Sequence, residues 1–465
     1  MSSDTLDPAN LEAIFKAYDV RGTVPDQLDD DLARVTGAAF VQVTGAPTVV
    51  VGHDMRPSSP GMAEAFAQGA AGAGADVVMV GLASTDQLYF ASGHLGHAGV
   101  MFTASHNPAQ YNGMKMCRAG AQPVGRESGL LEIRDLVALR ATTGAQLVPD
   151  GTTPGTVIEQ DVLGAYADHL LSLAPVRGRR LKVVVDAGNG MAGLTAPEVF
   201  DRIGSDQVEL VPMYFELDGT FPHHEANPIE PENLADLQRE VVRSGADLGL
   251  AFDGDADRCF LVDEQGRAVS PSTLTALIAA RELAKHPGAT VIHNLITSRG
   301  VPELVRELGG KPVRTRVGHS FIKATMAETD AVFGGEHSGH FYFRDFWRAD
   351  SGMLAALHAM AALAESSGTL SQLLADYERY PASGEINSTV EDQAAVLDAL
   401  RAQYAGRDGV EVDELDGLTV THADWWFNVR ASNTEPLLRL NAEGKDEATM
   451  TEIRDAVLAT IRSPR

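Results

Sequence analysis

The fold is decided by Leu248-Gly-Leu-Ala-Phe-Asp-Gly-Asp-Ala-Asp-Arg258, where a short apolar run leads directly into a loop of three carboxylates. A run of this length without alternation is typical of a strand buried on both faces. Gly99–Phe102 leads in the same way into Thr103-Ala-Ser-His-Asn-Pro108, and Ala331–Phe333 leads into Gly334-Gly-Glu-His-Ser-Gly-His340. Because ligands of open α/β sheets bind at strand ends, the pattern predicts three related α/β units with one functional loop each.

The length of 465 residues predicts three or four domains, since a typical domain has about 150 residues. Thr142–Gly155 is rich in Gly, Thr and Pro and is typical of a linker, and further breaks lie near the turn Val262–Arg267 and near Tyr380–Gly384. We therefore expect domains over residues 1–153, 154–262, 263–379 and 380–465. The last segment contains helix-like and strand-like stretches that predict a smaller α+β domain.

The composition excludes several classes of function. The chain has 37 Lys+Arg and 64 Asp+Glu, so its net charge is −27, and such a field repels nucleic acid and anionic membranes. The two cysteines cannot form a disulfide framework, and the acidic N-terminus is unlike a signal peptide. The nearly apolar stretch 352–364 is shorter than the roughly 20 residues that span a bilayer. We expect a cytoplasmic protein that binds neither nucleic acid nor membrane.

The acidic loop places Asp253, Asp255 and Asp257 at alternating positions. In an extended segment, this spacing turns three carboxylates to one side and suits a hard cation with oxygen ligands. The calcium loop of an EF-hand needs glycine at the sixth position, where this chain has Arg258, and a strand-like run follows instead of a helix. A solvated acidic turn is the alternative to a metal site. We predict a Mg²⁺ site, because few carboxylates combined with a phosphate oxygen suit this ion.

The serine loop contains Ser105 and His106, and Lys115 follows in the nearby segment Asn112-Gly-Met-Lys115. Alone, such a serine is more often a capping or turn residue than a nucleophile, and no Gly-x-Ser-x-Gly elbow surrounds it. A hydroxyl, a metal loop and a cation together are what phosphoryl transfer requires. The combination therefore favours a phospho-carrier serine.

Two more loops suggest a phosphorylated sugar as ligand. Arg430-Ala-Ser-Asn-Thr-Glu-Pro436 combines a guanidinium with hydroxyl and amide donors that can surround a phosphate, although a helix-capping segment would have the same composition. Glu336 and Ser338 offer a carboxylate and a hydroxyl for neighbouring sugar hydroxyls. A zinc site at His337 and His340 is disfavoured, because no helical His-Glu-x-x-His order is present.

Taken together, the four loops make the chain similar to the α-D-phosphohexomutase family, and most similar to its bacterial phosphomannomutase/phosphoglucomutase branch. The similarity extends from Phe15-Lys-Ala-Tyr-Asp-Val-Arg-Gly22 to the loop at Arg430, nearly the whole chain. It implies an α/β fold of three related domains with mixed sheets and a smaller C-terminal α+β domain around a central cleft. It also implies transfer of a phosphoryl group between the 6- and 1-positions of a hexose phosphate through a phosphoserine and a hexose 1,6-bisphosphate.

The resemblance also assigns roles to residues. It places the phosphoserine on Ser105 and the Mg²⁺ ligands on Asp253, Asp255 and Asp257, with the phosphoserine oxygen completing the metal site. Residues around the transferring group are implied to be His106, Lys115, Arg21 and Arg258. Substrate contacts are implied for His319, Glu336, Ser338, His340, Arg430, Ser432, Asn433 and Thr434.

Details of the loops indicate which branch of the family the chain resembles. The Thr-Ala-Ser-His start of the serine loop and the Ser-Asn-Thr of the last loop resemble the mannose/glucose branch rather than phosphoglucosamine mutases. His337 stands where the dual-specificity members carry methionine, which leaves the choice between mannose and glucose open. A phosphoglucosamine mutase, a metal-dependent sugar phosphatase and a sugar-phosphate sensor remain the alternatives. The sequence does not indicate an oligomeric state.

Overall fold

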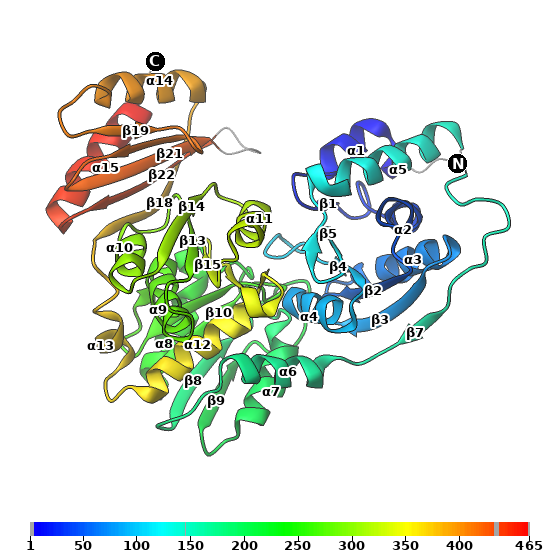
Figure 1. Ribbon diagram of the computed structural model, residues 1–465, viewed down its shortest axis with the longest axis horizontal. Helices are drawn as coiled ribbons and strands as arrows, with labels where there is room; N and C mark the ends of the chain where they lie inside the picture. Colours follow the sequence, from blue (N-terminus) through cyan, green and yellow to red (C-terminus); the bar gives the residue numbers. More distant parts are fainter. Residues whose placement is uncertain (1–3, 145, 432–436, 464–465) are drawn as a thin grey trace. The chain divides into compact units, whose positions relative to one another are not determined.

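The computed structural model describes residues 4–144, 146–431 and 437–463, and it divides into two compact units. The first unit comprises Met1–Ser270 and Ser338–Leu373, and the second comprises Pro271–His337 and Leu374–Arg465. Each unit is described by itself below, with the element labels of Figure 1.

The N-terminal part of the first unit is built on a seven-stranded mixed sheet with the order β1-β5-β4-β2-β3-β7, in which β6 also pairs with β5. The central strand β2 pairs in parallel with β3 and β4, and β5 is antiparallel to β4 and β1. The strands are β1 (Val20–Thr23), β2 (Thr48–His53), β3 (Asp76–Leu82), β4 (Ala98–Phe102), β5 (Tyr111–Arg118), β6 (Gln122–Pro123) and β7 (Val157–Glu159). The helices of this part are η1 (Asp4–Leu6), α1 (Pro8–Ile14), α2 (Asp30–Thr44), α3 (Ser59–Gly72), α4 (Thr85–Leu95), η2 (Arg126–Leu130) and α5 (Leu131–Thr143).

A second, five-stranded sheet of the first unit has the order β12-β11-β10-β8-β9. Its strands β8, β9 and β10 are parallel, and the hairpin of β11 and β12 continues the sheet in antiparallel fashion. The strands are β8 (Leu181–Asp186), β9 (Val208–Met213), β10 (Leu248–Phe252), β11 (Cys259–Asp263) and β12 (Ala268–Val269). The helices are α6 (Leu163–Leu173), α7 (Ala192–Ile203), η3 (Pro231–Leu234) and α8 (Ala235–Ser244).

The segment Ser338–Leu373 completes the first unit. It contains the strands β16 (Phe341–Phe343) and β17 (Ala349–Asp350), the short helix η4 (Arg344–Phe346) and the helix α12 (Gly352–Glu365). Helix α12 lies against α6 and β11, and all but its last residue are buried. The apolar stretch of the sequence is therefore a core helix. Among the described residues, no helix is both long and apolar enough to cross a bilayer.

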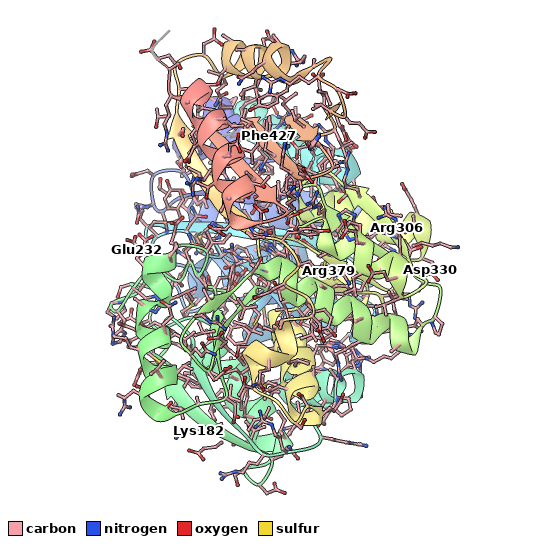
Figure 2. All side chains as sticks on the ribbon, turned by 90° about the vertical axis from the view of Figure 1, so that its left-hand side faces the viewer. Lys182, Glu232, Arg306, Asp330, Arg379 and Phe427 are labelled. Carbon is pink, nitrogen blue, oxygen red and sulfur yellow. The ribbon has the colours of Figure 1, made fainter. Side chains whose placement is uncertain are left out.

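The second unit contains the parallel strands β14, β13 and β15 and an antiparallel C-terminal sheet with the order β18-β22-β21-β20-β19. Phe427, labelled in Figure 2, is fully buried in the C-terminal core with side chains of helix α15. The strands are β13 (Thr290–Asn294), β14 (Lys311–Thr315), β15 (Phe333–Gly335), β18 (Ala382–Thr389), β19 (Glu411–Asp413), β20 (Leu418–Thr421), β21 (Trp425–Ala431) and β22 (Leu437–Gly444). The helices are α9 (Pro271–Lys285), α10 (Gly300–Glu307), α11 (His319–Thr329), α14 (Gln393–Tyr404) and α15 (Glu447–Ile461), and α13 (Leu370–Leu374) contains the point where the units meet in the sequence.

The predicted fold class of three α/β domains and a smaller α+β domain is confirmed. One local expectation is corrected, and two sheets extend past the expected domain ends. Strand β15 begins at Phe333, two residues later than the apolar run suggested. Strand β7 pairs with β3, so the first sheet extends beyond residue 153. The segment Val262–Arg267 is, as expected, a turn between two strands: it closes the hairpin of β11 and β12, and the second sheet extends to Val269. Gly, Pro and other turn-forming residues indicate that the chain reverses direction. The same residues are used for a turn within a sheet and for a connection between domains, so composition alone does not locate a domain end.

Candidate active site

Ser105 lies in the turn that follows β4, and its backbone is left-handed, with φ 51°. Its side chain is buried, and its Oγ donates a hydrogen bond of 2.7 Å to Oδ2 of Asp253 in the acidic loop. The hydroxyl of Thr103 accepts from the Ser105 amide at 2.9 Å. The left-handed conformation is uncommon for a residue with a Cβ atom and is retained only where the surroundings enforce it. The structure therefore holds this hydroxyl against the acidic loop.

The acidic loop connects β10 to β11, and the oxygens of Asp253, Asp255 and Asp257 lie within 4.8 Å of one another. The loop is a tight turn with Ala256 at φ 60°, so the expectation of an extended segment is wrong. The carboxylates converge because the chain turns around them. A Cβ atom on Gly254 would lie 2.4 Å from the Ser105 carbonyl oxygen, so only glycine allows the two loops to approach this closely.

Two cations, Lys115 on β5 and Arg258 at the end of the acidic loop, neutralise the carboxylates. Lys115 Nζ on β5 lies 2.7 Å from Oδ2 of Asp255 and 2.6 Å from Oδ2 of Asp257. Burial opposes its charge, but the two carboxylates outweigh burial and hold the pKa of Lys115 above its usual value. Arg258 Nε donates to Oδ2 of Asp253 at 2.9 Å. Burial raises the pKa of Asp253 to about 6, although Arg258 acts in the opposite direction.

The acidic loop fits a divalent cation. Oδ1 of Asp255 is buried and accepts no hydrogen bond from the described residues, and Oδ1 of Asp257, also buried, has only the imidazole of His340 nearby, at 3.5 Å. A buried carboxylate oxygen without a partner is costly, and a cation bound between these oxygens would remove that cost. The ligand atoms of Asp253, Asp255 and Asp257 are all oxygens, as Mg²⁺ prefers.

His106 and Arg21 flank the serine. Nδ1 of His106 lies 3.3 Å from Ser105 Oγ. Desolvation of the ring, followed by the charge of Arg258, holds the pKa of His106 well below its usual value, so the imidazole is neutral. Arg21 on β1 donates to the side-chain oxygen of Asn107 at 2.6 Å, which places its guanidinium beside the serine loop.

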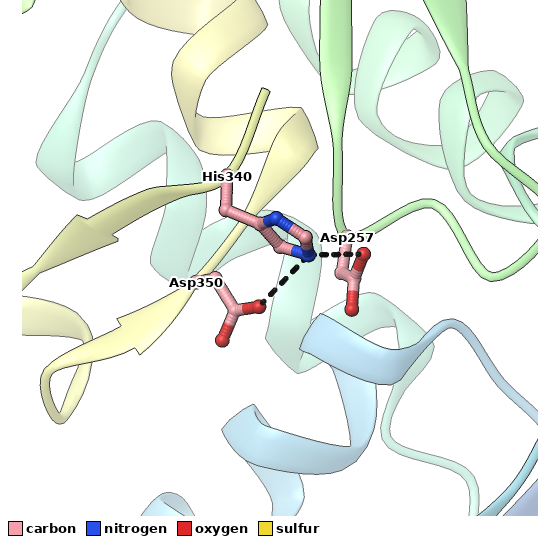
Figure 3. Close-up of side chains that lie close together, drawn as sticks. All are labelled: Asp257, His340 and Asp350. Carbon is pink, nitrogen blue, oxygen red and sulfur yellow. Dashed lines mark ion pairs between the residues drawn. The ribbon is translucent and has the colours of Figure 1, made fainter. Parts of the chain in front are cut away.

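His340 connects the acidic loop to β17, as Figure 3 shows. Its Nε2 lies 3.5 Å from Oδ1 of Asp257 and 4.0 Å from Oδ2 of Asp350, and Ser338 Oγ lies 3.2 Å from its Nδ1. Burial disfavours the charged ring, but Asp257 and Asp350 together outweigh burial and raise the pKa of His340. The two carboxylates therefore favour the protonated form of His340 beside the metal loop.

Arg56 supports the serine loop and was not singled out from the sequence. The residue is fully buried, and all five of its N–H groups donate hydrogen bonds. The acceptors are Asp54 Oδ2 (3.1 Å) and the carbonyl oxygens of Ser105 (2.9 Å), Asn107 (2.7 Å), Pro108 (2.8 Å) and Tyr111 (2.9 Å). The signal that could have revealed it is the polar segment Gly52-His-Asp-Met-Arg56 at the end of a buried strand.

The remaining residues that were predicted to contact the substrate belong to the second unit. Oε1 of Glu336, a buried side chain, accepts from Asn294 Nδ2 at 3.2 Å and from the Gly318 amide at 3.1 Å. Arg430 donates to Glu385 at 3.1 Å. His319 is the first residue of α11. Ser432, Asn433 and Thr434 lie outside the described residues.

Four models of the phosphoglucomutase/phosphomannomutase family match consecutive parts of the chain. The alpha/beta/alpha domains I, II and III match residues 12–140, 164–266 and 270–380, and the C-terminal domain matches residues 385–460. The chain belongs to this family. The prediction of an enzyme of this isomerase family is therefore confirmed.

Relatives within the phosphoglucomutase/phosphomannomutase family match over almost the full length. A chain named phosphohexose mutases from Xanthomonas campestris pv. campestris is 42% identical over 450 residues, 96% of this chain and 98% of the relative. A phosphomannomutase from Escherichia coli K12 is 40% identical over 453 residues, again 96% and 98% of the two chains. The crystal structure of a family protein from Burkholderia thailandensis has 34% sequence identity and a TM-score of 0.85, covering 97% of this chain and 98% of that chain.

Proposed function

We propose that this family member catalyses the reversible interconversion of mannose 6-phosphate and mannose 1-phosphate through a phosphorylated Ser105. The observation that carries the proposal is the 2.7 Å contact between Ser105 Oγ and Asp253 of the acidic loop. A nucleophilic hydroxyl, a cation site and two further cations in one buried cluster are the parts that phosphoryl transfer requires.

The proposed reaction has two half-reactions. Phosphorylated Ser105 gives its phosphoryl group to the free hydroxyl of the hexose phosphate, which forms a hexose 1,6-bisphosphate. After the bisphosphate has turned around, Ser105 recovers the phosphoryl group that was first at the other end. Added hexose 1,6-bisphosphate would act as an activator, because it phosphorylates Ser105.

The residues of the cluster have separate proposed roles. Asp253, Asp255 and Asp257 would hold Mg²⁺, and a bound Mg²⁺ would spread the negative charge of the transferring group. Lys115, Arg21 and Arg258 stabilise the same charge from the protein side. Lys115 is also proposed to handle the proton at the sugar oxygen, and because its pKa is held above its usual value it would act as the acid. Neutral His106 lies beside Ser105 Oγ and orients it between transfers.

Contacts to the sugar are proposed for Ser338 and His340 in the first unit and, separately, for residues of the second unit. Glu336 is held by Asn294 and Gly318 and offers its carboxylate to neighbouring sugar hydroxyls. His319 contacts the substrate beside it. Arg430, Ser432, Asn433 and Thr434 bind the phosphate that is not transferred.

The preference for mannose is supported by the relatives that are named phosphomannomutase, among them proteins of Escherichia coli and Vibrio cholerae. Glucose phosphates are proposed as further substrates, because the family name covers both activities. Location in the cytoplasm fits a protein that acts on such phosphosugars.

The deciding experiment compares the wild type with Ser105→Ala. We expect the wild type to convert mannose 1-phosphate when the matching bisphosphate is present, and intact mass to show one phosphate that Ser105→Ala lacks. The control is Ser172→Ala, an exposed serine on α6 that should change neither result. Parallel assays with glucose 1-phosphate and glucosamine 1-phosphate rank the substrates. Undiminished mutase activity of Ser105→Ala would refute the proposal, and release of inorganic phosphate at the rate of turnover would identify a phosphatase.

A further inference from the structure

The first turn of helix α4 contacts the acidic loop through Thr85. Its Oγ1 donates to Oδ2 of Asp255 at 2.6 Å, and its amide donates to the Asp255 carbonyl oxygen at 2.9 Å. Both residues are fully buried, although 170 positions separate them in the sequence. The amide lies at the N-terminus of α4, where the helix carries partial positive charge. Thr85 therefore donates hydrogen bonds to Asp255 from both its backbone amide and its side-chain hydroxyl.

The first turn of α4 is held in place by its own N-terminal cap and by hydrogen bonds to two other helices. Ser84 caps the helix by accepting from the Gln87 amide, and its hydroxyl also donates to Asp86. Oδ2 of Asp86 accepts from Tyr166 on α6 at 2.7 Å and from Ser351, the cap of α12, at 2.6 Å. The turn that carries Thr85 is thus bonded to two other helices of the first unit. The Thr85 hydroxyl has little freedom to move away from the acidic loop.

The two oxygens of Asp255 differ in their surroundings. Oδ2 accepts from Thr85 and from Lys115, whereas Oδ1 is buried and accepts no hydrogen bond from the residues described. A carboxylate with one oxygen occupied by fixed donors keeps the other oxygen in a fixed direction. Partners behind the ligands of a metal site typically contribute 10- to 100-fold in metal affinity.

We propose that Thr85 is a positioning residue for the divalent cation, because its hydroxyl fixes Oδ2 of Asp255 and leaves Oδ1 available as the ligand. The inference rests on the proposed function, in which Asp255 is a ligand of Mg²⁺. Lys115 binds the same oxygen but comes from a long, rotatable side chain. The short, β-branched Thr85 on an anchored helix turn supplies the rigid contact.

The test measures Mn²⁺ binding to the full-length protein by electron paramagnetic resonance, with Ser105 phosphorylated to the same extent in every sample. Thr85→Val keeps the shape of the side chain and removes the hydroxyl, and we expect the Kd for Mn²⁺ to rise about 10- to 100-fold. Thr85→Ser restores the donor and should stay within about threefold of the wild type. The Mg²⁺ concentration for half-maximal activity should shift in parallel, while the KM for mannose 1-phosphate stays unchanged.

The matched control is Thr36→Val, since Thr36 is a fully buried threonine of α2 whose hydroxyl has no hydrogen-bond partner among the described residues. It should leave Mn²⁺ binding unchanged. An unchanged Kd in Thr85→Val would overturn the role of Thr85. If Asp255→Asn binds Mn²⁺ as the wild type does, the metal site of the proposed function fails instead. Should circular dichroism show that Thr85→Val is unfolded, the comparison of Thr85→Ala with Thr85→Ser decides the same question.

Discussion

Ser105 Oγ lies 2.7 Å from Oδ2 of Asp253, a residue 148 positions further along the chain. The contact joins the loop after β4 of the first sheet to the loop after β10 of the second. Neither loop alone contains both a nucleophile and a cation site. The proposed chemistry therefore depends on the packing of the two sheets within the first unit.

Removal of the metal tests the acidic loop directly. We expect chelation by EDTA to abolish mutase turnover and added Mg²⁺ to restore it, because the cation neutralises charge on the transferring group. Asp255→Asn should lower kcat by about 100-fold or more at saturating substrate. The measurement is a coupled assay of mannose 1-phosphate conversion across Mg²⁺ concentrations. Full activity in EDTA would contradict a metal-assisted reaction.

The approach of the two loops is tested at Gly254. Gly254→Ala places a Cβ atom 2.4 Å from the Ser105 carbonyl oxygen, so one of the loops must shift. We expect kcat to fall about 100-fold, since misplacement of a reacting group by about 1 Å has this effect. Gly72→Ala, at the end of α3 with open space around it, is the control and should leave kcat unchanged. Equal activity of both variants would show that the loops need not approach so closely.

Arg56 is tested by its effect on stability. Arg56→Met leaves the buried carboxylate of Asp54 without its ionic partner and removes the guanidinium donors of four carbonyl groups. Breaking such a buried pair costs about 3–5 kcal/mol of the free energy of unfolding. Arg56→Lys keeps the charge with fewer donors and should lose less. The measurement is urea denaturation followed by circular dichroism.

The control for Arg56 is Arg239→Met, which removes an exposed ion pair with Asp236 and should cost less than about 1 kcal/mol. Equal losses in Arg56→Met and Arg239→Met would show that the buried guanidinium does not support the serine loop.

The raised pKa of Asp86 predicts that the free energy of unfolding depends on pH. Burial raises the pKa of Asp86 to about 7, against the effect of the hydroxyls of Ser351, Ser84 and Tyr166. The folded state then binds the proton more tightly than the unfolded state, so the free energy of unfolding falls as pH rises from about 4 to about 7. The slope from this group is at most about 1.4 kcal/mol per pH unit. Asp86→Asn keeps an acceptor oxygen and removes the titration.

The measurement for Asp86 is urea denaturation of the metal-free wild type and of Asp86→Asn between pH 4.5 and 8. The stability of the wild type relative to the variant should decrease across this range. A difference that stays constant with pH would show that Asp86 is not protonated in the folded protein.

Much of this protein is determined by local patterns of its sequence. The apolar runs at Gly99–Phe102 and Leu248–Phe252 are buried strands, because uninterrupted apolar residues suit a strand covered on both faces. The loops that follow them carry the serine and the carboxylates, since polar residues at a strand end remain accessible to ligands. The fold class and the composition of the candidate site could therefore be predicted.

Only the tertiary structure decided which of these groups meet. The contacts of Thr85 with Asp255 and of Arg56 with the serine loop join residues whose own neighbourhoods do not indicate which distant residue is the partner. The pairing of β7 with the first sheet and the packing of Ser338–Leu373 within the first unit are of the same kind. A buried polar group must find a partner, but the sheets and helices that surround it determine which partner that is. Packing of distant segments sets this choice, and local sequence does not encode it.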